Sequence, residues 1–258
     1  MNYHTHTARC MHAEGTDEQY VLAAIEGGFR GLGFADHIPW PFKSGFVSPI
    51  RMPMSDLDGY LNSVNQLRER YADRIELYMG MESEYFPRYR DHYDYLRDRG
   101  CQYFILGQHY NDTEEENDYI GFECETDDGV KRYADQVAEA LNTGIFCYVA
   151  HPDLFMRHRT ADQYSNACIE AAKVICQAAK EANVPIEYNL LGLDLQLQGR
   201  DRGYPSTPFW QQASAYGNRV ILGVDAHKPS SLSNTDLWEE GIRRVNATGL
   251  ELQESISL

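Results

Sequence analysis

The sequence has 258 residues, of which 43% are hydrophobic and 24% charged, which is the composition of an ordinary globular protein. Its formal net charge of −16 argues against a general binder of nucleic acid or of an acidic membrane surface, because those partners need a basic surface. The apolar runs are shorter than a membrane span, no signal peptide is recognisable and the six cysteines form no C-x-x-C pair, so we expect a soluble, cytoplasmic protein with reduced thiols.

Short apolar runs that end in a polar residue alternate along the chain with amphipathic segments. In chain order, strands are expected at residues 2–6, 31–37, 75–82, 102–109, 145–152, 185–190 and 219–227. Helices are expected between them, as at residues 55–71, 128–144 and 166–184, where apolar residues have helical spacing. Such alternation forms a parallel sheet with right-handed crossovers. No linker or low-complexity tract interrupts it, so we expect a single domain over residues 1–258.

A histidine or an acid ends nearly every predicted strand. In a barrel the loops that follow the parallel strands converge on one end, whereas an open sheet concentrates its site at one switch point. The pattern therefore favours an α/β barrel of seven strands with its site at their carboxyl ends. Two long segments, residues 37–54 and 110–127, are expected to be loops at that same end.

Seven of the nine histidines lie at these strand ends or in the first loop, together with two acids. This candidate ligand set is His4, His6, His12, His37, Glu82, His109, His151, Asp225 and His227. Residues two apart on a strand point to one face, so His4 and His6 can hold a single ion, and Asp225 with His227 repeats that spacing. One strand-end histidine alone is more often a hydrogen-bonded core residue. The prediction therefore depends on finding so many histidines and acids at the ends of successive strands. Imidazole and carboxylate donors suit Zn²⁺, Mn²⁺ or Fe²⁺, and nine of them are enough for two or three divalent ions.

These motifs resemble those of the polymerase-and-histidinol-phosphatase (PHP) metallohydrolases. The matching motifs, in family order over essentially the whole chain, are H-T-H at His4 to His6, then His12, "ADH" ending at His37, "GME" at Glu82, "GQH" at His109, "AHPD" around His151 and "DAH" at Asp225 to His227. The resemblance implies a distorted (β/α)7 TIM-like barrel with a trinuclear metal site. It assigns His4, His6, Glu82 and Asp225 to the first ion, Glu82, His109 and His151 to the second, and His12, His37 and His227 to the third.

Paired divalent ions activate water and hold both oxygens of an in-line displacement at phosphorus, so the expected reaction is hydrolysis of a phosphomonoester. The chain looks most like the stand-alone histidinol-phosphatase branch, which implies that it removes phosphate from L-histidinol phosphate in histidine biosynthesis. Glu82, Asp225 and His227 are then expected to be catalytic as well as metal-binding. The run "LLGLDLQLQGRDRGYPS" departs from the usual pattern of that branch. This departure bears on recognition of the part of the substrate that carries no phosphate, and not on the metal chemistry.

Arginines are expected to bind the phosphate, because the planar guanidinium can hold two oxygens at once. The resemblance implies one from each of two loops, and the preferred pair is Arg157 and Arg202, with Arg159 and Arg200 as alternatives. The acids Asp36 and Glu84 are either partners of metal ligands or solvated, and for Glu84 the solvated state is favoured. The acids of residues 110–127 could attract the ammonium of the substrate, but a solvated loop is favoured there too.

Three alternatives remain at this point. One is a PHP phosphoesterase for another small phosphomonoester or a nucleoside bisphosphate. Another is a non-catalytic metal-binding protein, against which the full ligand set argues. The third is an amidohydrolase, which usually needs a bridging carboxylated lysine, and no strand-end lysine is evident. For the general acid, a metal-bound water, Asp36 and Asp153 are all candidates.

Overall fold

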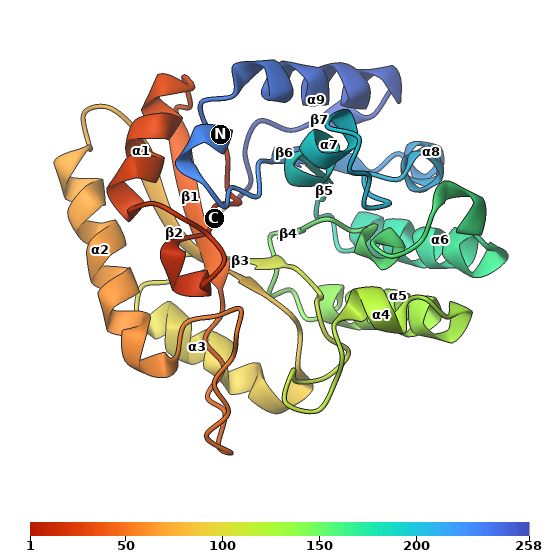
Figure 1. The fold of residues 1–258 in the computed structure, drawn as a ribbon, viewed down its shortest axis with the longest axis horizontal. Helices are drawn as coiled ribbons and strands as arrows, with labels where there is room; N and C mark the ends of the chain where they lie inside the picture. The colour runs from red at the N-terminus through yellow and green to blue at the C-terminus, as the bar shows by residue number, and fades with distance from the viewer. Residues whose placement is uncertain (258) are drawn as a thin grey trace.

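A single parallel sheet forms the centre of the molecule in this computed structural model, which describes residues 1–257. Within them the strands are β1 Gly31–His37, β2 Glu76–Ser83, β3 Tyr103–Leu106, β4 Tyr148–Val149, β5 Ile186–Asn189, β6 Arg219–Gly223 and β7 Glu251–Leu252. Strands that follow one another in the chain are neighbours in the sheet, in the order β1 to β7, and every pair is parallel. The sheet curls into a half-barrel with the helices around its outer side (Figure 1).

Helices connect the strands, as expected for parallel pairing. The α-helices are α1 Asp17–Glu26, α2 Leu57–Arg70, α3 Arg90–Asp98, α4 Ile120–Glu123, α5 Asp127–Leu141, α6 Asn166–Glu181, α7 Leu190–Leu197, α8 Thr207–Tyr216 and α9 Thr235–Ala247. Short 3-10 helices are η1 Ala8–Cys10, η2 Met54–Asp56, η3 Pro87–Tyr89, η4 Leu154–Met156, η5 Ala161–Gln163 and η6 Pro229–Ser231. The helices predicted at residues 55–71, 128–144 and 166–184 are confirmed as α2, α5 and α6 within a few residues.

Residues 2–6 form isolated bridges in place of the predicted strand. Asn2 pairs with Leu32 of β1, whereas Thr5 pairs with Ala226, which follows β6. Because the segment divides its pairing between two neighbours, it has too few consecutive pairs for a regular strand. It still lies between β1 and the segment after β6, and it carries its two histidines there.

The sequence analysis missed the strand β7, and it also missed the helix α4, which lies in the segment 110–127 that was expected to be a loop. The two residues of β7 pair with Arg219 and Val220 of β6, and neither is buried. Two partly exposed residues cannot show the alternation that predicts a strand. The strand predicted at residues 145–152 is also shorter than expected, since only Tyr148–Val149 pair regularly.

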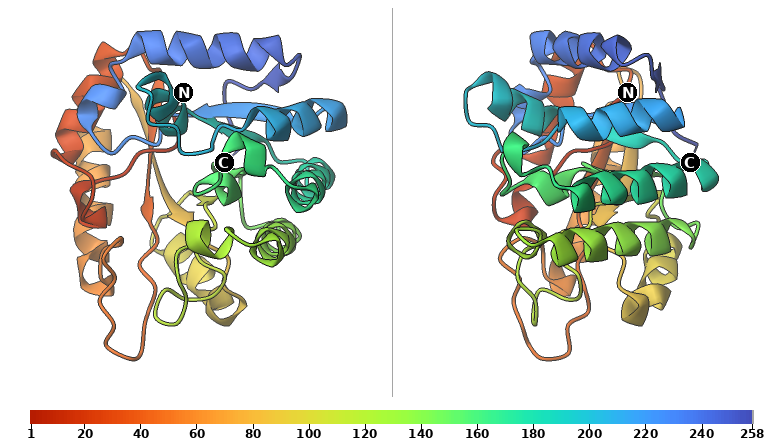
Figure 2. Two further views of the ribbon diagram at one scale, coloured as in Figure 1. Left: turned by 45° about the vertical axis from the view of Figure 1, so that its right-hand side comes forward. Right: turned by 90° about the vertical axis from the view of Figure 1, so that its right-hand side faces the viewer.

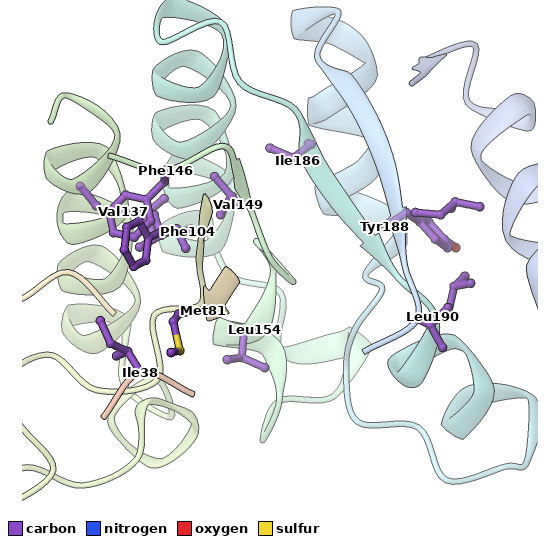
Figure 3. Packing of buried hydrophobic residues seen from close by; sticks show 14 of the residues in the cluster. Ile38, Met81, Phe104, Val137, Phe146, Val149, Leu154, Ile186, Tyr188 and Leu190 are labelled. Atoms are coloured by element: carbon purple, nitrogen blue, oxygen red, sulfur yellow. The ribbon is translucent and has the colours of Figure 1, made fainter. Parts of the chain in front are cut away.

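The two faces of the strands pack in different ways. On the outer face Phe104 of β3, Val137 of α5 and Phe146 belong to one buried cluster and lie close together (Figure 3). Because side chains alternate along a strand, the intervening residues face the inside of the curled sheet. There they form a smaller cluster, named here the inner cluster, which consists of Tyr3, Ala35, Tyr103, Ile105, Tyr148, Ala150 and Ile221. Each fully buried large apolar side chain contributes about 1.5–3 kcal/mol to folding.

No helix in residues 1–257 is long and apolar enough to cross a membrane. The structure has all six cysteines as free thiols, which agrees with the reduced state expected from their spacing.

Candidate metal centre

A cavity of about 340 Å³ opens at the carboxyl ends of the strands. Eight of the nine predicted ligands line it, namely His6, His12, His37, Glu82, His109, His151, Asp225 and His227. His4 lies directly behind them and is fully buried. The remaining wall contains Arg157, three tyrosines and three aliphatic side chains, which are Tyr110, Tyr119, Tyr204, Ile50, Leu154 and Leu191.

The carboxylate of Glu82 lies at the centre of the histidines. Its Oε1 is 2.8 Å from Nε2 of His151 and 3.5 Å from Nε2 of both His4 and His109. Its Oε2 is 3.1 Å from Nδ1 of His37 and 3.4 Å from Nε2 of His6. Five imidazoles therefore face the two oxygens of one carboxylate, so Glu82 is the central acid of the candidate ligand set.

Asp225 occupies the opposite side of the first two histidines. Its Oδ1 lies 3.3 Å from Nε2 of His6 and 3.4 Å from Nε2 of His4. The Nδ1 atom of His227 is 3.4 Å from the same oxygen. The acid that replaces an imidazole on the last predicted strand thus faces the H-T-H motif directly.

The three histidines predicted to bind the third ion also lie close together. His12, His37 and His227 each offer a ring nitrogen, and these atoms lie within 4.8 Å of one another. The rings of His12 and His227 are 4.6 Å apart between centroids. His12 is the exposed member of the group, so this side of the site faces the opening of the cavity.

The donor atoms fit divalent cations. Nε2 of His4 and Nε2 of His6 approach to 3.2 Å, and Nε2 of His227 is buried without a hydrogen-bond partner among residues 1–257. Buried polar atoms are otherwise nearly always paired, so unpaired nitrogens that converge beside carboxylates are suited to bind a cation. Cys10 offers a thiol within the same 4.8 Å of His6 and His227, although its position was not predicted as a ligand.

The carboxyl groups of Glu82 and Asp225 are held in the ionised form, which is the form that binds a metal. Burial opposes the charge of Glu82, but the neighbouring His109 and His4 hold its pKa well below the ordinary value. Burial likewise opposes the charge of Asp225, and His4 and His6 keep its pKa well below the ordinary value. Burial lowers the pKa of His227 to about 3, which leaves this imidazole neutral, the form that binds metal.

Two residues of β5 hold the ligands from behind. Oε2 of Glu187 lies 2.8 Å from Nδ1 of His4, and Nδ2 of Asn189 donates to Oδ2 of Asp225 at 3.1 Å. Partners of this kind fix the orientation of a ligand and are costly to remove. The sequence analysis did not assign these roles to Glu187 and Asn189. Two polar residues at alternate positions of a buried strand were the signal that could have identified them.

The two acids left open by the sequence are both buried partners of histidines. Oε1 of Glu84 lies 3.1 Å from Nδ1 of His109, and Oδ1 of Asp36 lies 3.5 Å from Nδ1 of His6. The solvated state favoured for Glu84 was wrong, because the side chain is fully buried. Burial opposes its charge, but the adjacent Arg51 lowers the pKa of Glu84 to about 2.

Backbone geometry adapts to the site at two ligands. His151 has φ of 28° and Asp225 has φ of 51°, and non-glycine residues rarely adopt such values. Strain of this kind is retained where the surrounding structure needs the side chain in a particular direction. A Cβ at Gly107 would overlap Oε1 of Glu82, so the glycine of the "GQH" motif makes room for the central carboxylate.

Comparisons with known proteins identify the family of this chain. A profile described as the PHP domain matches residues 2–190. The chain belongs to the PHP domain family. Over 241 residues it is 25% identical to "Probable histidinol-phosphatase" of Deinococcus radiodurans, covering 89% of this chain and 86% of that protein. Over 118 residues it is 26% identical to "Histidinol-phosphatase" of Bacillus subtilis, covering 43% of this chain and 44% of the relative.

Two solved structures share the fold of this PHP domain. The HisK protein of Listeria monocytogenes matches 90% of this chain and 97% of its own length, with a TM-score of 0.75 and 22% identity. The histidinol phosphate phosphatase HisK of Lactococcus lactis matches 99% of this chain and 96% of its own, with a TM-score of 0.73 and 16% identity. The latter protein was crystallised in complex with zinc, L-histidinol and phosphate.

The four candidate arginines of the PHP domain have different surroundings. Arg157 lines the cavity, donates from Nη1 to the hydroxyl of Tyr204 at 3.1 Å and lies over the ring of Tyr119. Arg159 is buried elsewhere and donates from Nε to the carbonyl of Cys124 at 2.6 Å. The side chains of Arg200 and Arg202 are exposed in the loop between α7 and α8 and contribute nothing to the described cavity wall.

The candidate general acids and the acids of residues 110–127 do not line the described cavity. Asp153 is buried and accepts from the backbone N–H of Ser206 at 2.6 Å, and burial raises its pKa to about 7. Neither Asp153 nor Asp36 lines the described cavity. The acids of residues 110–127 are also outside that lining, so the cavity shows no support for their attracting the ammonium group.

Proposed function

We propose that this chain is a metal-dependent phosphomonoester hydrolase that converts L-histidinol phosphate and water to L-histidinol and phosphate in histidine biosynthesis. The observation that carries the proposal is the central carboxylate of Glu82, whose two oxygens face five imidazoles at the carboxyl ends of the strands. The names of the Deinococcus and Bacillus relatives support the substrate. The partner is accordingly a small phosphorylated molecule.

Two or three divalent ions, of zinc, manganese or iron, are the proposed cofactors. The first would be held by His4, His6, Glu82 and Asp225, the second by Glu82, His109 and His151, and the third by His12, His37 and His227. Such ions supply a water of lowered pKa and stabilise the attacking and leaving oxygens of an in-line displacement at phosphorus. The zinc in the Lactococcus lactis structure is consistent with this assignment.

The side chains around the ligands orient the substrate in this proposal. Arg157 presents its guanidinium to the cavity and is held by Tyr204, so it is placed to bind two phosphate oxygens. Arg202 remains the proposed second arginine, and because its side chain is exposed, its loop must close over the substrate. Ile50 and Leu154 form apolar wall that excludes water from the reacting phosphate.

The proposal also covers the closure of the barrel and the extent of the domain. We propose a distorted (β/α)7 TIM-like barrel with its metal site at the carboxyl ends of the strands, in one PHP domain over residues 1–258, of which Leu258 lies outside the described residues. The bridges of Asn2 and Thr5, which lie between β1 and the segment after β6, support a closed barrel. The free thiols are those expected in a reducing cytoplasm.

A second candidate is a phosphoesterase for another small phosphomonoester or a nucleoside bisphosphate. The observation in its favour is Leu191, which lines the cavity from α7 and belongs to the run that departs from the histidinol-phosphatase pattern. A different wall there changes the fit of the part of the substrate without phosphate, while the metal ligands are unaffected.

The test is steady-state phosphate release from L-histidinol phosphate and from a panel of small phosphomonoesters and adenosine bisphosphates. The protein is loaded with Mn²⁺ or Zn²⁺ and its metal content is determined. A kcat/KM for L-histidinol phosphate that exceeds the others by orders of magnitude supports the proposal. Comparable rates for all substrates favour the second candidate. Absence of release with every metal and substrate supports a non-catalytic metal-binding protein.

A further inference from the structure

A buried ionic cluster lies beside the metal centre, outside the cavity. It consists of Arg51, Glu84 and Glu114, named here the Arg51 cluster, whose side chains are 1%, 0% and 3% exposed. The three residues come from the loops that follow β1, β2 and β3. The first of these loops extends far from the sheet, at the bottom of both views in Figure 2.

Arg51 binds both carboxylates at two points. Nη1 and Nη2 donate to the two oxygens of Glu84 at 3.1 and 3.0 Å. Nε and Nη2 donate to the two oxygens of Glu114 at 3.0 and 2.9 Å. Nη1 also donates to the carbonyl of Ile38 at 3.1 Å. A planar guanidinium can satisfy two carboxylates in this way, whereas the ammonium of a lysine cannot.

Glu84 connects this cluster to a predicted metal ligand. Its Oε1 lies 3.1 Å from Nδ1 of His109, and its Oε2 accepts from Nε1 of Trp40 at 3.2 Å. On the opposite side of the same ring, Nε2 of His109 lies 3.5 Å from Oε1 of Glu82. A carboxylate that accepts from one ring nitrogen fixes the ring and makes the other nitrogen a better metal ligand. The contacts therefore run from Arg51 through Glu84 to His109.

Glu114 connects the cluster to the wall of the cavity. It lies between Tyr110 and Tyr119 in the chain, and both tyrosines line the cavity. Arg51 directly follows Ile50, which lines the same cavity from the other loop. Ser44 and Glu115 form a second hydrogen bond between the two loops. The ion pair of Arg51 with Glu114 thus holds together the two segments that form this wall.

Stability alone is a weak reason for such a cluster. Removing three charged groups from water costs several kcal/mol per ion, and apolar residues of similar size often stabilise a core at least as well. One cation between two carboxylates also leaves the cluster with an excess of negative charge. That excess lies beside His109, where it strengthens the donation from Nδ1 to Glu84.

We propose that Arg51 is a positioning residue for both the metal centre and the substrate wall. Through Glu84 it orients His109 toward the metal that His109 would share with Glu82. Through Glu114 it holds Ile50, Tyr110 and Tyr119 in the wall that faces the substrate. The effect on the substrate wall rests on the proposed function. The effect on metal binding can be measured without turnover.

The test separates the two effects, on metal binding and on the substrate wall, with single variants of the full chain loaded with Zn²⁺. Glu84→Gln should weaken Zn²⁺ binding about 10- to 100-fold, as other partners of metal-binding histidines do, and should leave KM within about threefold. Glu114→Gln should keep the affinity for Zn²⁺ and raise KM about tenfold, because it loosens the wall alone. Arg51→Lys should show both changes. Zn²⁺ affinity is measured by competition with a chromogenic chelator, and KM by phosphate release.

Arg159→Lys is the matched control, since Arg159 is a buried arginine bound to Asp127 and to backbone carbonyls away from the metal centre. It should lower Tm without changing Zn²⁺ affinity or KM. The inference is overturned if Glu84→Gln and Glu114→Gln behave like this control, or if both change Zn²⁺ affinity and KM together. If the wild-type chain hydrolyses no phosphoester, the proposed function fails, and the Zn²⁺ measurements together with the Kd for inorganic phosphate still test the inference.

Discussion

The two ends of the space enclosed by the sheet differ sharply although the same strands form them. Along β1, Ala35 belongs to the inner cluster and His37, two residues further on, faces Glu82. Ile221 of β6 also belongs to the inner cluster, and Asp225, four residues further on, belongs to the candidate metal centre. A shift of two to four residues along one strand therefore replaces apolar packing by imidazole and carboxylate groups.

The comparison shows how the fold separates stability from chemistry. The inner cluster gains free energy of folding by removing aromatic and aliphatic surface from water. The carboxyl end instead buries Glu82, Asp225 and several histidines, and buried charged groups cost free energy unless they are paired. Substitutions at the carboxyl end should mainly cost activity, whereas substitutions in the inner cluster should mainly cost stability.

The largest expected effect is that of Glu82→Gln. Loss of the charge that we propose to bridge two ions should lower kcat/KM by about a thousandfold, equivalent to about 4 kcal/mol of transition-state stabilisation. The metal-free variant should retain the wild-type circular dichroism spectrum, because the side chain fills the same volume. Phosphate release and metal analysis check this together. Near wild-type turnover with full metal content would contradict the assignment of Glu82 as the central ligand.

Gly107→Ala tests the space around the same carboxylate. The added methyl group overlaps Oε1 of Glu82, so the carboxylate must move and activity should fall about a hundredfold. Gly59→Ala is the control, because Gly59 lies in α2 with open space around it. That variant should keep full activity and gain up to about 1 kcal/mol in free energy of unfolding. Equal activities of the two variants would refute the close approach at Gly107.

Arg157→Ala and Arg159→Ala compare two arginines that are two residues apart. Arg157 faces the cavity, so its loss should lower kcat/KM roughly 10- to 100-fold, as expected for a lost charge-assisted contact. Arg159 binds backbone carbonyls outside the cavity, so its loss should lower Tm and leave kcat/KM per folded molecule unchanged. Kinetics and thermal unfolding of both variants test the comparison. If Arg159→Ala lost activity and Arg157→Ala lost only stability, Arg159 would be the phosphate-binding arginine.

Tyr103→Phe examines the inner cluster. The hydroxyl of Tyr103 lies 2.8 Å from the carbonyl oxygen of Tyr3 and 3.0 Å from that of Phe34. Its removal leaves buried carbonyls without this donor and should lower the free energy of unfolding by about 1–2 kcal/mol. Urea unfolding measures the change. Metal affinity and kcat should stay at the wild-type level, and a selective loss of metal would contradict the separation of the two ends.

The smallest expected effect is a pH dependence at His92, which supports the loop after β1. Burial lowers the pKa of His92, whose Nε2 lies 2.8 Å from the carbonyl oxygen of Pro39. The neutral ring therefore stabilises the fold fully above about pH 6.5, and this contribution is lost as pH falls through the folded-state pKa. His92→Gln should reduce the loss of stability that occurs as the pH falls from 7 to 5. Identical pH dependence in variant and wild type would exclude this role.

Much of the clustering at the candidate metal centre was predictable because it follows from local periodicity. A polar residue that ends a parallel strand must lie at the carboxyl edge, and so the sequence placed His37, Glu82 and Asp225 together. The Arg51 cluster was not predictable, since its members come from three loops whose packing depends on tertiary contacts. The polar residues of β5 gave a signal for Glu187, but its partner was not predictable, since the contact with His4 joins residues 183 positions apart.

The bridges of residues 2–6 set the order in which the protein can mature. During synthesis this segment emerges long before its partners, because Asn2 accepts from the backbone N–H of Val224, 222 residues later. The backbone N–H of His6 donates to the carbonyl of Ala226 at 3.0 Å, so this hydrogen bond also cannot form until Ala226 has been synthesised. Contacts this distant in sequence form late, because closing a long loop is entropically costly. The candidate metal centre can therefore assemble only after residue 226 has been translated, because a shorter nascent chain lacks the partners that hold His4 and His6 in place.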